Sequence, residues 1–386
     1  MTRASSVGVV TFSLDAGLLA ALRRWPDVEA PDLVASDAAD RLILDESADA
    51  LSAAAAGEIV VIGDSYGALT LSAAQAGATA LRVHQDPLTG ERALSANAEL
   101  FDLADAFRSL PLSARLLTGA RLVLMRLPRS LDALRDIAGL IAAHAHPEVV
   151  VYAGGRLKHM TPAMNDVLRE HFDRVDVTHA RQKSRVLIAR GPRNGVDPAP
   201  RRAVHDGVTI CAFGGVFAGS SIDIGTRLLL EHLPSEIAGE GDIIDLACGS
   251  GVIATRLALQ HPERFIVACD DSASAVESTR ATALANKVAE RVTVVRDDML
   301  ATRADASARL IALNPPFHTG AAVHEGIAPH MFADAARVLQ PGGELWTVWN
   351  SSLQYRPALE RIVGPTRQVA RNAKFTVTVS TPHQDR

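Results

Sequence analysis

Short apolar runs alternate with longer helix-compatible segments over the second half of the chain. The apolar runs cover residues 243–246, 265–269, 292–295 and 310–313, and residues 344–349 alternate between apolar and polar side chains. Segments such as 252–259 between these runs are compatible with helices. Short continuous apolar runs are typical of strands that are buried on both faces. The alternation therefore predicts an α/β fold with a doubly wound, mostly parallel sheet.

The first of these strands leads into a glycine-containing turn. Asp245 lies within the apolar run, and Gly249 and Gly251 follow immediately before the helix expected from Val252. Glycine lets a backbone approach a ligand closely, and the first N–H groups of a helix attract negative charge. The turn predicts a site for an anionic or carboxylate-bearing cofactor, while an ordinary tight turn in a parallel sheet remains the alternative.

Polar residues also follow each of the next three strands. Asp270 follows the second run, Asp298 follows the third, and Asn-Pro-Pro-Phe occupies residues 314–317 after the fourth. The carboxyl ends of parallel strands share one edge of the sheet, where open α/β folds place their sites. We therefore expect these residues to form one site. Asp271 and Asp297 are the one-residue alternatives in the two acidic pairs.

Taken together, these positions resemble the class I S-adenosylmethionine-dependent methyltransferases. The resemblance implies S-adenosylmethionine as the cofactor and a binding set formed by Asp245, Ala247, Gly249, Gly251, Asp270, Asp271, Asp298, Met299 and Asn314. Within this set the family pattern implies Asp270 for the ribose hydroxyls and Asp298 for the adenine amine. Ala254 and Thr255 stand where a dinucleotide fingerprint would have its third glycine, which disfavours NAD.

The Asn-Pro-Pro-Phe segment marks the members of this family that methylate a planar, amide-like nitrogen. The resemblance therefore implies catalytic roles for Asn314, Pro315, Pro316 and Phe317. Such a nitrogen is a poor nucleophile because its lone pair is delocalised. The Asn314 oxygen and the Pro315 carbonyl would accept its hydrogens, and Phe317 would stack on a base turned out of its helix. His318 could assist proton loss, although a loop histidine is more often structural.

The first half of the chain repeats the second half in a degenerate form. Gly67 aligns with Gly251 and Asp86 with Asp270 at an offset of 184 residues, and residues 121–128 align with 309–316 at an offset of 188. We therefore predict two tandem Rossmann-like class I methyltransferase domains that arose by duplication.

The N-terminal copy lacks several residues on which the resemblance depends. Val61, Ser65 and Arg126 stand at the positions of Asp245, Gly249 and Asn314. Arginine cannot accept a hydrogen bond, so we expect this copy to be catalytically inactive. Because arginine suits phosphate contact, we hypothesise that the copy recognises RNA. The candidate RNA-binding residues are Arg126, Arg129, Arg156, Lys158, Lys183 and Arg185.

A segment rich in proline and glycine separates the two copies. Residues 191–200 contain three prolines and two glycines, a composition typical of a linker. We predict a degenerate domain over residues 1–190, a linker over 191–204 and a catalytic domain over 205–386. Residues 121–204 carry 15 Lys and Arg against 8 Asp and Glu, which fits either a phosphate-binding surface or a solvated face.

Composition excludes several other classes of protein. Hydrophobic residues make up 48% and charged residues 22%, as in an ordinary globular protein. No apolar run is long enough to cross a bilayer and the first residues lack a signal-peptide core, so we expect a cytoplasmic protein without membrane contact. The three cysteines have no metal-binding spacing, and we expect no metal and a monomeric chain. A net charge of −5 argues against unselective coating of nucleic acid.

The layout of an inactive and an active copy narrows the resemblance to the tandem-domain ribosomal RNA (guanine-N2) methyltransferases. Residues 214–230, 350–355 and 372–377 are similar to those of the large-subunit (23S) enzymes. This implies methylation of a guanine N2 amine in ribosomal RNA, either naked or in a partly assembled subunit. The alternatives are a small-subunit (16S) guanine-N2 enzyme, a glutamine-N5 protein methyltransferase, and a non-catalytic RNA-binding protein with the same fold.

Overall fold

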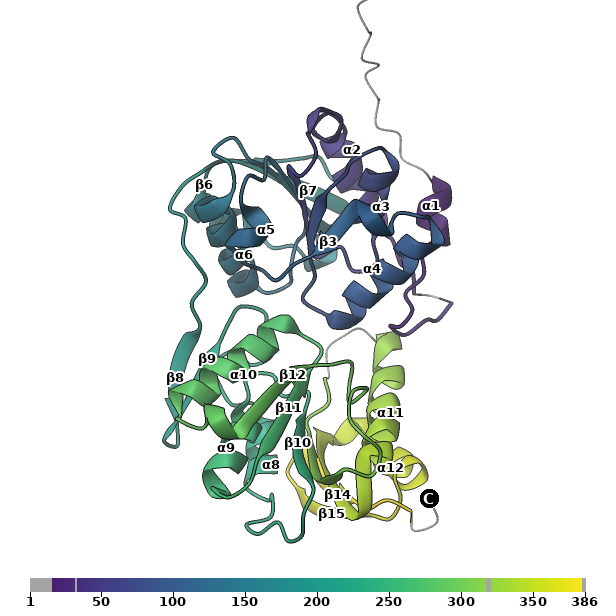
Figure 1. Ribbon diagram of the computed structural model, residues 1–386, viewed down its shortest axis with the longest axis vertical. Coiled ribbons are helices and arrows are strands. Elements are labelled where there is room, and N and C mark those ends of the chain that lie inside the picture. The colour runs from purple at the N-terminus through teal and green to yellow at the C-terminus, as the bar shows by residue number, and fades with distance from the viewer. Residues whose placement is uncertain (1–15, 32, 317–320, 384–386) are drawn as a thin grey trace, which may run out of the picture. The chain divides into compact units, whose positions relative to one another are not determined.

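The computed structural model describes residues 16–31, 33–316 and 321–383, and it contains two compact units (Figure 1). Unit 1 comprises residues 1–198 and unit 2 comprises residues 199–386. The division falls within the segment 191–204 that the sequence predicts as a linker. Strand β7 (Ser184–Pro192) and strand β8 (Arg201–His205) extend into that segment, so the irregular chain between them covers residues 193–200.

Both units are built from alternating strands and helices. Unit 1 contains α1 (Ala16–Ala21), α2 (Ala38–Ala53), β1 (Ile59–Ile62), α3 (Ala68–Gln75), β2 (Leu81–His84), α4 (Leu88–Leu100), η1 (Ala104–Ala106), β3 (Phe107–Ser109), α5 (Ala114–Leu117), β4 (Leu122–Arg126), α6 (Leu131–His144), β5 (Val150–Arg156), η2 (Leu157–His159), α7 (Ala163–His171), β6 (Phe172–Val177) and β7. Unit 2 contains β8, β9 (Val208–Ala212), α8 (Ile224–Leu230), β10 (Asp242–Leu246), α9 (Val252–Gln260), β11 (Ile266–Asp270), α10 (Ala273–Ala285), η3 (Ala289–Arg291), β12 (Val292–Arg296), β13 (Ala308–Leu313), α11 (Ala321–Val338), β14 (Leu339–Asn350), η4 (Ser351–Leu353), α12 (Arg356–Ile362), β15 (Thr366–Arg371) and β16 (Phe375–Ser380).

The seven-stranded sheets of the two units share one strand order. It is β3-β2-β1-β4-β5-β7-β6 in unit 1 and β12-β11-β10-β13-β14-β16-β15 in unit 2. Only β7 and β16 run antiparallel to their neighbours. The predicted doubly wound, mostly parallel fold is confirmed, and each strand of one sheet has a counterpart in the other.

The strand register corrects the alignment of the two copies at β2. In unit 1 Ile62 pairs with His84, and in unit 2 Leu246 pairs with Cys269. Because Ile62 and Leu246 stand at equivalent positions of β1 and β10, His84 is the counterpart of Cys269. The offset at β2 is therefore 185 residues and not 184, and helices α4 and α10 begin at the same offset. The alignment of Asp86 with Asp270 was wrong by one residue.

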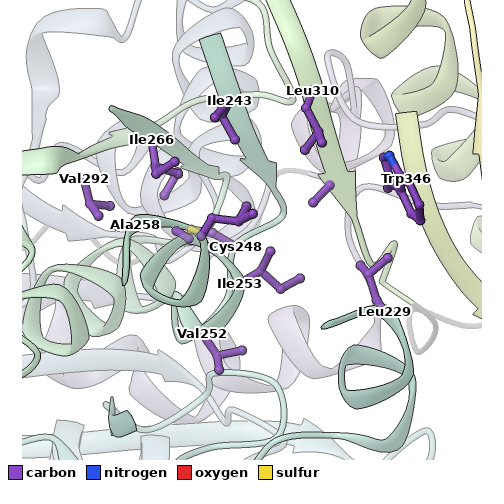
Figure 2. Packing of buried hydrophobic residues seen from close by; sticks show 14 of the residues in the cluster. Leu229, Ile243, Cys248, Val252, Ile253, Ala258, Ile266, Val292, Leu310 and Trp346 are labelled. Atoms are coloured by element: carbon purple, nitrogen blue, oxygen red, sulfur yellow. The ribbon is translucent and has the colours of Figure 1, made fainter. Parts of the chain in front are cut away.

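Unit 2 buries an apolar cluster on each face of its sheet. On one face Ile243 and Leu310 point from adjacent strands toward Val252 and Ile253 of α9 (Figure 2). On the other face Phe332 of α11 is fully buried among residues of β10 and β13. Because both faces are covered, the edge at which the parallel strands end is the part of the sheet open to a ligand.

Candidate active site

The turn after β10 places three alternating residues in the left-handed region. The φ angles are +59° at Ala247, +55° at Gly249 and +74° at Gly251. A Cβ atom on Gly251 would lie 2.6 Å from the Cγ2 atom of Thr279, so this glycine is required for the close approach of α10. A Cβ atom on Gly249 would meet nothing within 4 Å among the described residues. The turn therefore leaves space beside Gly249 into which a ligand fits.

Unit 1 keeps the backbone shape of this turn. Gly63, Ser65 and Gly67 have φ angles of +75°, +61° and +100°. Ser65 adopts the left-handed conformation without being glycine, which costs roughly 1–2 kcal/mol. The duplication has thus preserved the turn, while the side chains around it have changed.

Asp245 lies beneath the turn and is completely buried in β10. Its Oδ2 atom accepts a hydrogen bond of 2.9 Å from the backbone N–H of Ala254 in the first turn of α9. Burial raises the pKa of Asp245 to about 7. In the described residues, Oδ1 has no hydrogen-bond partner. Asp245 therefore joins the strand to the helix that follows it, and its predicted part in cofactor binding would act through the shape of the turn.

Asp245→Asn is expected to flatten the pH dependence of stability. Because the pKa of Asp245 rises from 3.8 to about 7 in the folded chain, its favourable contribution is present at acidic pH and is lost as the pH rises through 7. This rise corresponds to roughly 4 kcal/mol. Between pH 4 and pH 8, calorimetric midpoints should fall less steeply for the variant than for the wild type. Parallel curves for the two proteins would contradict the raised pKa.

Asp270 connects the turn to the next helix. Its Oδ2 atom accepts a hydrogen bond of 2.9 Å from the N–H of Gly249, and its Oδ1 atom accepts one of 2.9 Å from the N–H of Ser272. Carboxylate oxygens have lone pairs beyond these two bonds and could still accept hydroxyl donors. For the neighbouring Asp271, the main-chain carbonyl accepts a hydrogen bond from Arg296. The structure thus brings Asp270 to the glycine turn, where the family pattern expects it.

The two acids after β12 have different surroundings. Asp297 is fully buried, and its Oδ2 atom accepts hydrogen bonds of 2.9 Å and 2.7 Å from the N–H and the hydroxyl of Thr302. Asp298 is only partly buried. We therefore keep Asp298 rather than Asp297 as the candidate for the adenine amine. Met299 and Ala247 both pack against the apolar cluster under this edge of the sheet.

Asn314 stands beside the glycine turn at the same edge. Leu313 and Leu246 are paired across β13 and β10, so the two segments begin at adjacent positions on neighbouring strands. Nδ2 of Asn314 donates hydrogen bonds of 2.8 Å to Oγ1 of Thr226 and of 3.2 Å to Oδ2 of Asp223. Its Oδ1 atom is buried and has no hydrogen-bond partner among the described residues. The site thus contains a buried acceptor that the described part of the protein does not use.

The contact of Asn314 with Asp223 and Thr226 was not predicted. Asp223 is the N-cap of α8, and it accepts a hydrogen bond of 2.8 Å from the N–H of Gly225. An acid before a short leucine-rich segment is a recognisable N-cap signal. That signal could have predicted the start of the helix. It could not have predicted a contact with a residue 91 positions later in the chain.

The rest of the Asn-Pro-Pro-Phe segment is partly described. Pro315 is buried and Pro316 is exposed. Phe317 and His318 lie outside the described residues, so base stacking and proton removal at these positions remain predictions. Pro315 has no N–H group, and its carbonyl is therefore the only main-chain hydrogen-bonding group of that residue.

Arg126, the unit 1 counterpart of Asn314, is held within an internal ion-pair cluster. It binds Asp37 at 2.8 Å and Asp40 at 2.5 Å. Burial raises the pKa of Asp40 to about 6, although the positive charge of Arg126 acts in the opposite direction. Both carboxylates already bind the guanidinium, and this corrects the expectation that Arg126 contacts RNA phosphate. We therefore remove it from the RNA-binding set.

Protein side chains occupy the positions around the turn of unit 1. The corrected register puts Gln85 where unit 2 has Asp270, and this amide is buried and donates to the carbonyl of Gly90 at 3.1 Å. The carboxylate of Asp64 accepts hydrogen bonds of 2.8 Å from the N–H groups of Leu69 and Thr70 at the start of α3. An internal carboxylate therefore takes up the donors that an anionic ligand would need.

The five remaining basic candidates of unit 1 follow the ends of β4 and β5 or precede β7. Arg129, Lys158 and Lys183 are exposed, whereas Arg156 and Arg185 are partly buried. The main chains of Leu157 and Lys183 are hydrogen-bonded at 2.9 Å, and β5 pairs with β7 there. The pKa of His159 is lowered first by burial and then by the charges of Arg129, Lys158 and Arg156. These basic groups therefore gather at the carboxyl edge of the unit 1 sheet.

Two further features concern the described residues only. None of the described helices combines the length and the hydropathy that a membrane span requires. In the same part of the chain, no group of three or more His, Cys, Asp and Glu residues could hold a metal ion. The site of unit 2 therefore consists of main-chain donors, carboxylates and one amide.

Known protein families and structures match both units. Family models described as "RLMG N-terminal domain" and "Methyltransferase small domain" match residues 11–193 and 207–379. The ribosomal RNA large subunit methyltransferase G of Streptomyces avermitilis is 34% identical over 375 residues, covering 92% of this chain and 95% of that protein. The protein of the same name from Shewanella amazonensis is 33% identical over 367 residues, with 92% and 94% covered.

A solved structure has the same fold over nearly the whole chain. It is the T. thermophilus 16S rRNA N2 G1207 methyltransferase, in complex with AdoMet and guanosine. The TM-score is 0.73 at 21% identity, and the match covers 90% of this chain and 92% of that chain.

Proposed function

Because this chain belongs to the ribosomal RNA large subunit methyltransferase G family, which is S-adenosylmethionine-dependent, we propose that its target is the exocyclic N2 amine of a guanine in large-subunit ribosomal RNA. The unused Oδ1 acceptor of Asn314, next to the glycine turn of unit 2, is the observation that carries this proposal. Such an RNA would be met in the cytoplasm, and all proposed catalytic residues come from one chain, consistent with a monomer.

The residues around the glycine turn fit S-adenosylmethionine. Gly249 leaves space beside the turn, and Asp270 stands at the end of the neighbouring strand with acceptor capacity for ribose hydroxyls. Asp298 would accept from the adenine amine, while Ala247 and Met299 would form an apolar wall. When bound, S-adenosylmethionine supplies an electrophilic methyl group on its sulfonium.

Asn314 would activate the guanine amine through its side-chain oxygen. Oδ1 would accept one hydrogen of the N2 amine, and the carbonyl of Pro315 would accept the other. Two acceptors aimed at these hydrogens favour a tetrahedral nitrogen, which exposes its lone pair. The buried position strengthens both hydrogen bonds because little water competes for them. Rigid placement of the base would contribute much of the rate.

Methyl incorporation into defined substrates tests this proposal. The purified chain would be supplied with labelled S-adenosylmethionine and with unmethylated 23S RNA, 16S RNA or a release-factor protein. We expect label in 23S RNA, with N2-methylguanosine after nucleoside digestion. Label confined to 16S RNA or to the protein would favour an alternative substrate. Cofactor binding without methylation of any of the three would favour a non-catalytic RNA-binding role.

Unit 1 is proposed to hold the RNA. Its set of basic residues at the carboxyl edge of the sheet comprises Arg129, Arg156, Lys158, Lys183 and Arg185. Partial engagement limits one member, since Arg156 lies 4.0 Å from Asp37. Exposed cations bind phosphates by releasing condensed counterions, so the affinity should fall as the salt concentration rises.

Reversing two of these charges should weaken RNA binding. The double variant Arg129→Glu and Lys158→Glu is expected to lower RNA affinity and to reduce the salt slope by about two, because each lost phosphate contact removes about one unit. Fluorescence anisotropy at several salt concentrations measures both quantities. Arg108→Glu, an exposed arginine on β3, serves as the matched control. An unchanged slope in the double variant would rule out this surface.

A further inference from the structure

Three side chains at the start of α8 and the end of β13 form a closed chain of hydrogen bonds. Nδ2 of Asn314 donates to Oγ1 of Thr226 at 2.8 Å and to Oδ2 of Asp223 at 3.2 Å. The hydroxyl of Thr226 donates its own hydrogen to Oδ2 of Asp223. Thr226 is buried with 5% of its surface exposed, which protects these bonds from competing water.

Only one orientation of the Asn314 amide satisfies this chain. A carboxylate presents acceptors alone, and the Thr226 hydroxyl, whose hydrogen is already engaged, presents only its lone pairs. Both neighbours therefore require the NH2 group of the amide. If the amide were rotated by half a turn, Oδ1 would face two acceptors. The oxygen is thus directed away from α8, where it is buried and has no partner among the described residues.

We infer that Asp223 and Thr226 are positioning residues that fix the Asn314 amide with its oxygen toward the substrate amine. The inference rests on the proposed function, because that function assigns the substrate contact to Oδ1. A rotated amide would present its NH2 group to the donors of the guanine amine, and no hydrogen bond could form between them. Asp223 and Thr226 thereby select the reactive state of a catalytic residue without contacting the substrate themselves.

Unit 1 contains the same arrangement with charged residues. Asp37 is the N-cap of α2, as Asp223 is of α8, and Asp40 follows three positions later. Both acids bind Arg126 at the end of β4. In unit 2 the second of these positions is a neutral threonine, and the residue on the strand is a neutral amide. The helix positions differ between the units together with the side chain that they hold, as expected if holding it is their role.

Removing the Thr226 hydroxyl tests the inference. Thr226→Val keeps the shape of the side chain, so an amide held only by Asp223 is expected to turn over RNA more slowly. We expect kcat to fall on the order of 10- to 100-fold, the effect of a misplaced catalytic group. The KM for RNA and the affinity for S-adenosylmethionine should stay within about twofold, since the hydroxyl is not proposed to contact either ligand. Thr226→Ser should restore most of kcat.

A second substitution in the background Asn314→Ala separates positioning from general destabilisation. If Thr226 acts through Asn314, adding Thr226→Val to Asn314→Ala causes no further loss of kcat. A structural effect of the valine would lower the rate again in that background. Thr366→Val is the matched control, because it removes a hydroxyl that is also bonded to a side chain, that of Ser380 on an edge strand.

The outcomes separate this inference from the proposed function. Full kcat in Thr226→Val, with Asn314→Ala inactive, overturns the positioning role and leaves the proposed function intact. Full kcat in Asn314→Ala overturns the proposed function itself. If Thr226→Val loses folding or cofactor binding, Asp223→Asn gives the same test while keeping a good helix-capping residue. Full kcat in a folded Asp223→Asn variant would also overturn the inference.

Discussion

Asn314→Ala is expected to lower kcat on the order of 10³-fold, as the loss of a preorganised group that acts in the transition state does. The alanine removes the only side-chain acceptor that the strand end offers to the substrate amine, and the Pro315 carbonyl alone would hold one hydrogen. Single-turnover rates with saturating RNA measure this effect. S-adenosylmethionine affinity, measured by calorimetry, should change little because the glycine turn and Asp270 are untouched.

The same substitution at another strand end provides the control for this experiment. Asn350 ends β14, and its side chain accepts hydrogen bonds from the N–H and hydroxyl of Ser352. Asn350→Ala therefore removes a local capping bond and should leave kcat within about threefold of the wild type, since such a cap is worth about 1 kcal/mol of stability. A rate for Asn314→Ala as high as that for Asn350→Ala would refute the role of Asn314.

The second large effect is expected at Asp270, where Asp270→Asn should weaken S-adenosylmethionine binding roughly 10- to 100-fold. An amide cannot accept from both N–H groups, because one of its arms is itself a donor. Either the bond from Gly249 or the bond from Ser272 would be lost, and the glycine turn would shift. The loss of one or two charge-assisted hydrogen bonds accounts for this range. Calorimetric titration with S-adenosylmethionine measures it without any turnover.

Asp271→Asn separates Asp270 from its neighbour in the sequence. The main-chain carbonyl of Asp271, which accepts from Arg296, is retained in that variant. Cofactor affinity should therefore fall much less than in Asp270→Asn. If Asp271→Asn has the larger effect, the ribose contact belongs to Asp271, and the assignment of Asp270 is wrong.

Much of the fold could be predicted because local patterns determine it. The apolar runs of the second half coincide with β10, β11, β12 and β13, since strands buried on both faces must be apolar throughout. The predicted resemblance is confirmed by relatives named ribosomal RNA large subunit methyltransferase G. Strand β14 was predicted only over residues 344–349. The structure begins it at Leu339, through a Pro-Gly-Gly segment that is typical of a turn.

The candidate site was less predictable because its contacts join distant parts of the chain. The ion pairs of Arg126 with Asp37 and Asp40 span 89 and 86 residues, and no local pattern indicates that these acids face the arginine. The chain from Asn314 to Asp223 spans 91 residues for the same reason. The one-residue error at Asp86 arose because the loop and the strand that follows it have different offsets. Only strand pairing reveals that difference.

The geometry of a ternary complex tests the central claim most directly. The full chain would be crystallised with S-adenosylhomocysteine and guanosine, and the distance from the guanine N2 atom to Oδ1 of Asn314 would be measured. We predict a hydrogen-bond distance of about 2.9 Å, with the Nδ2 atom still bound to Thr226 and Asp223. A guanine whose N2 atom lies away from Asn314, or an amide rotated toward it through Nδ2, would contradict the account.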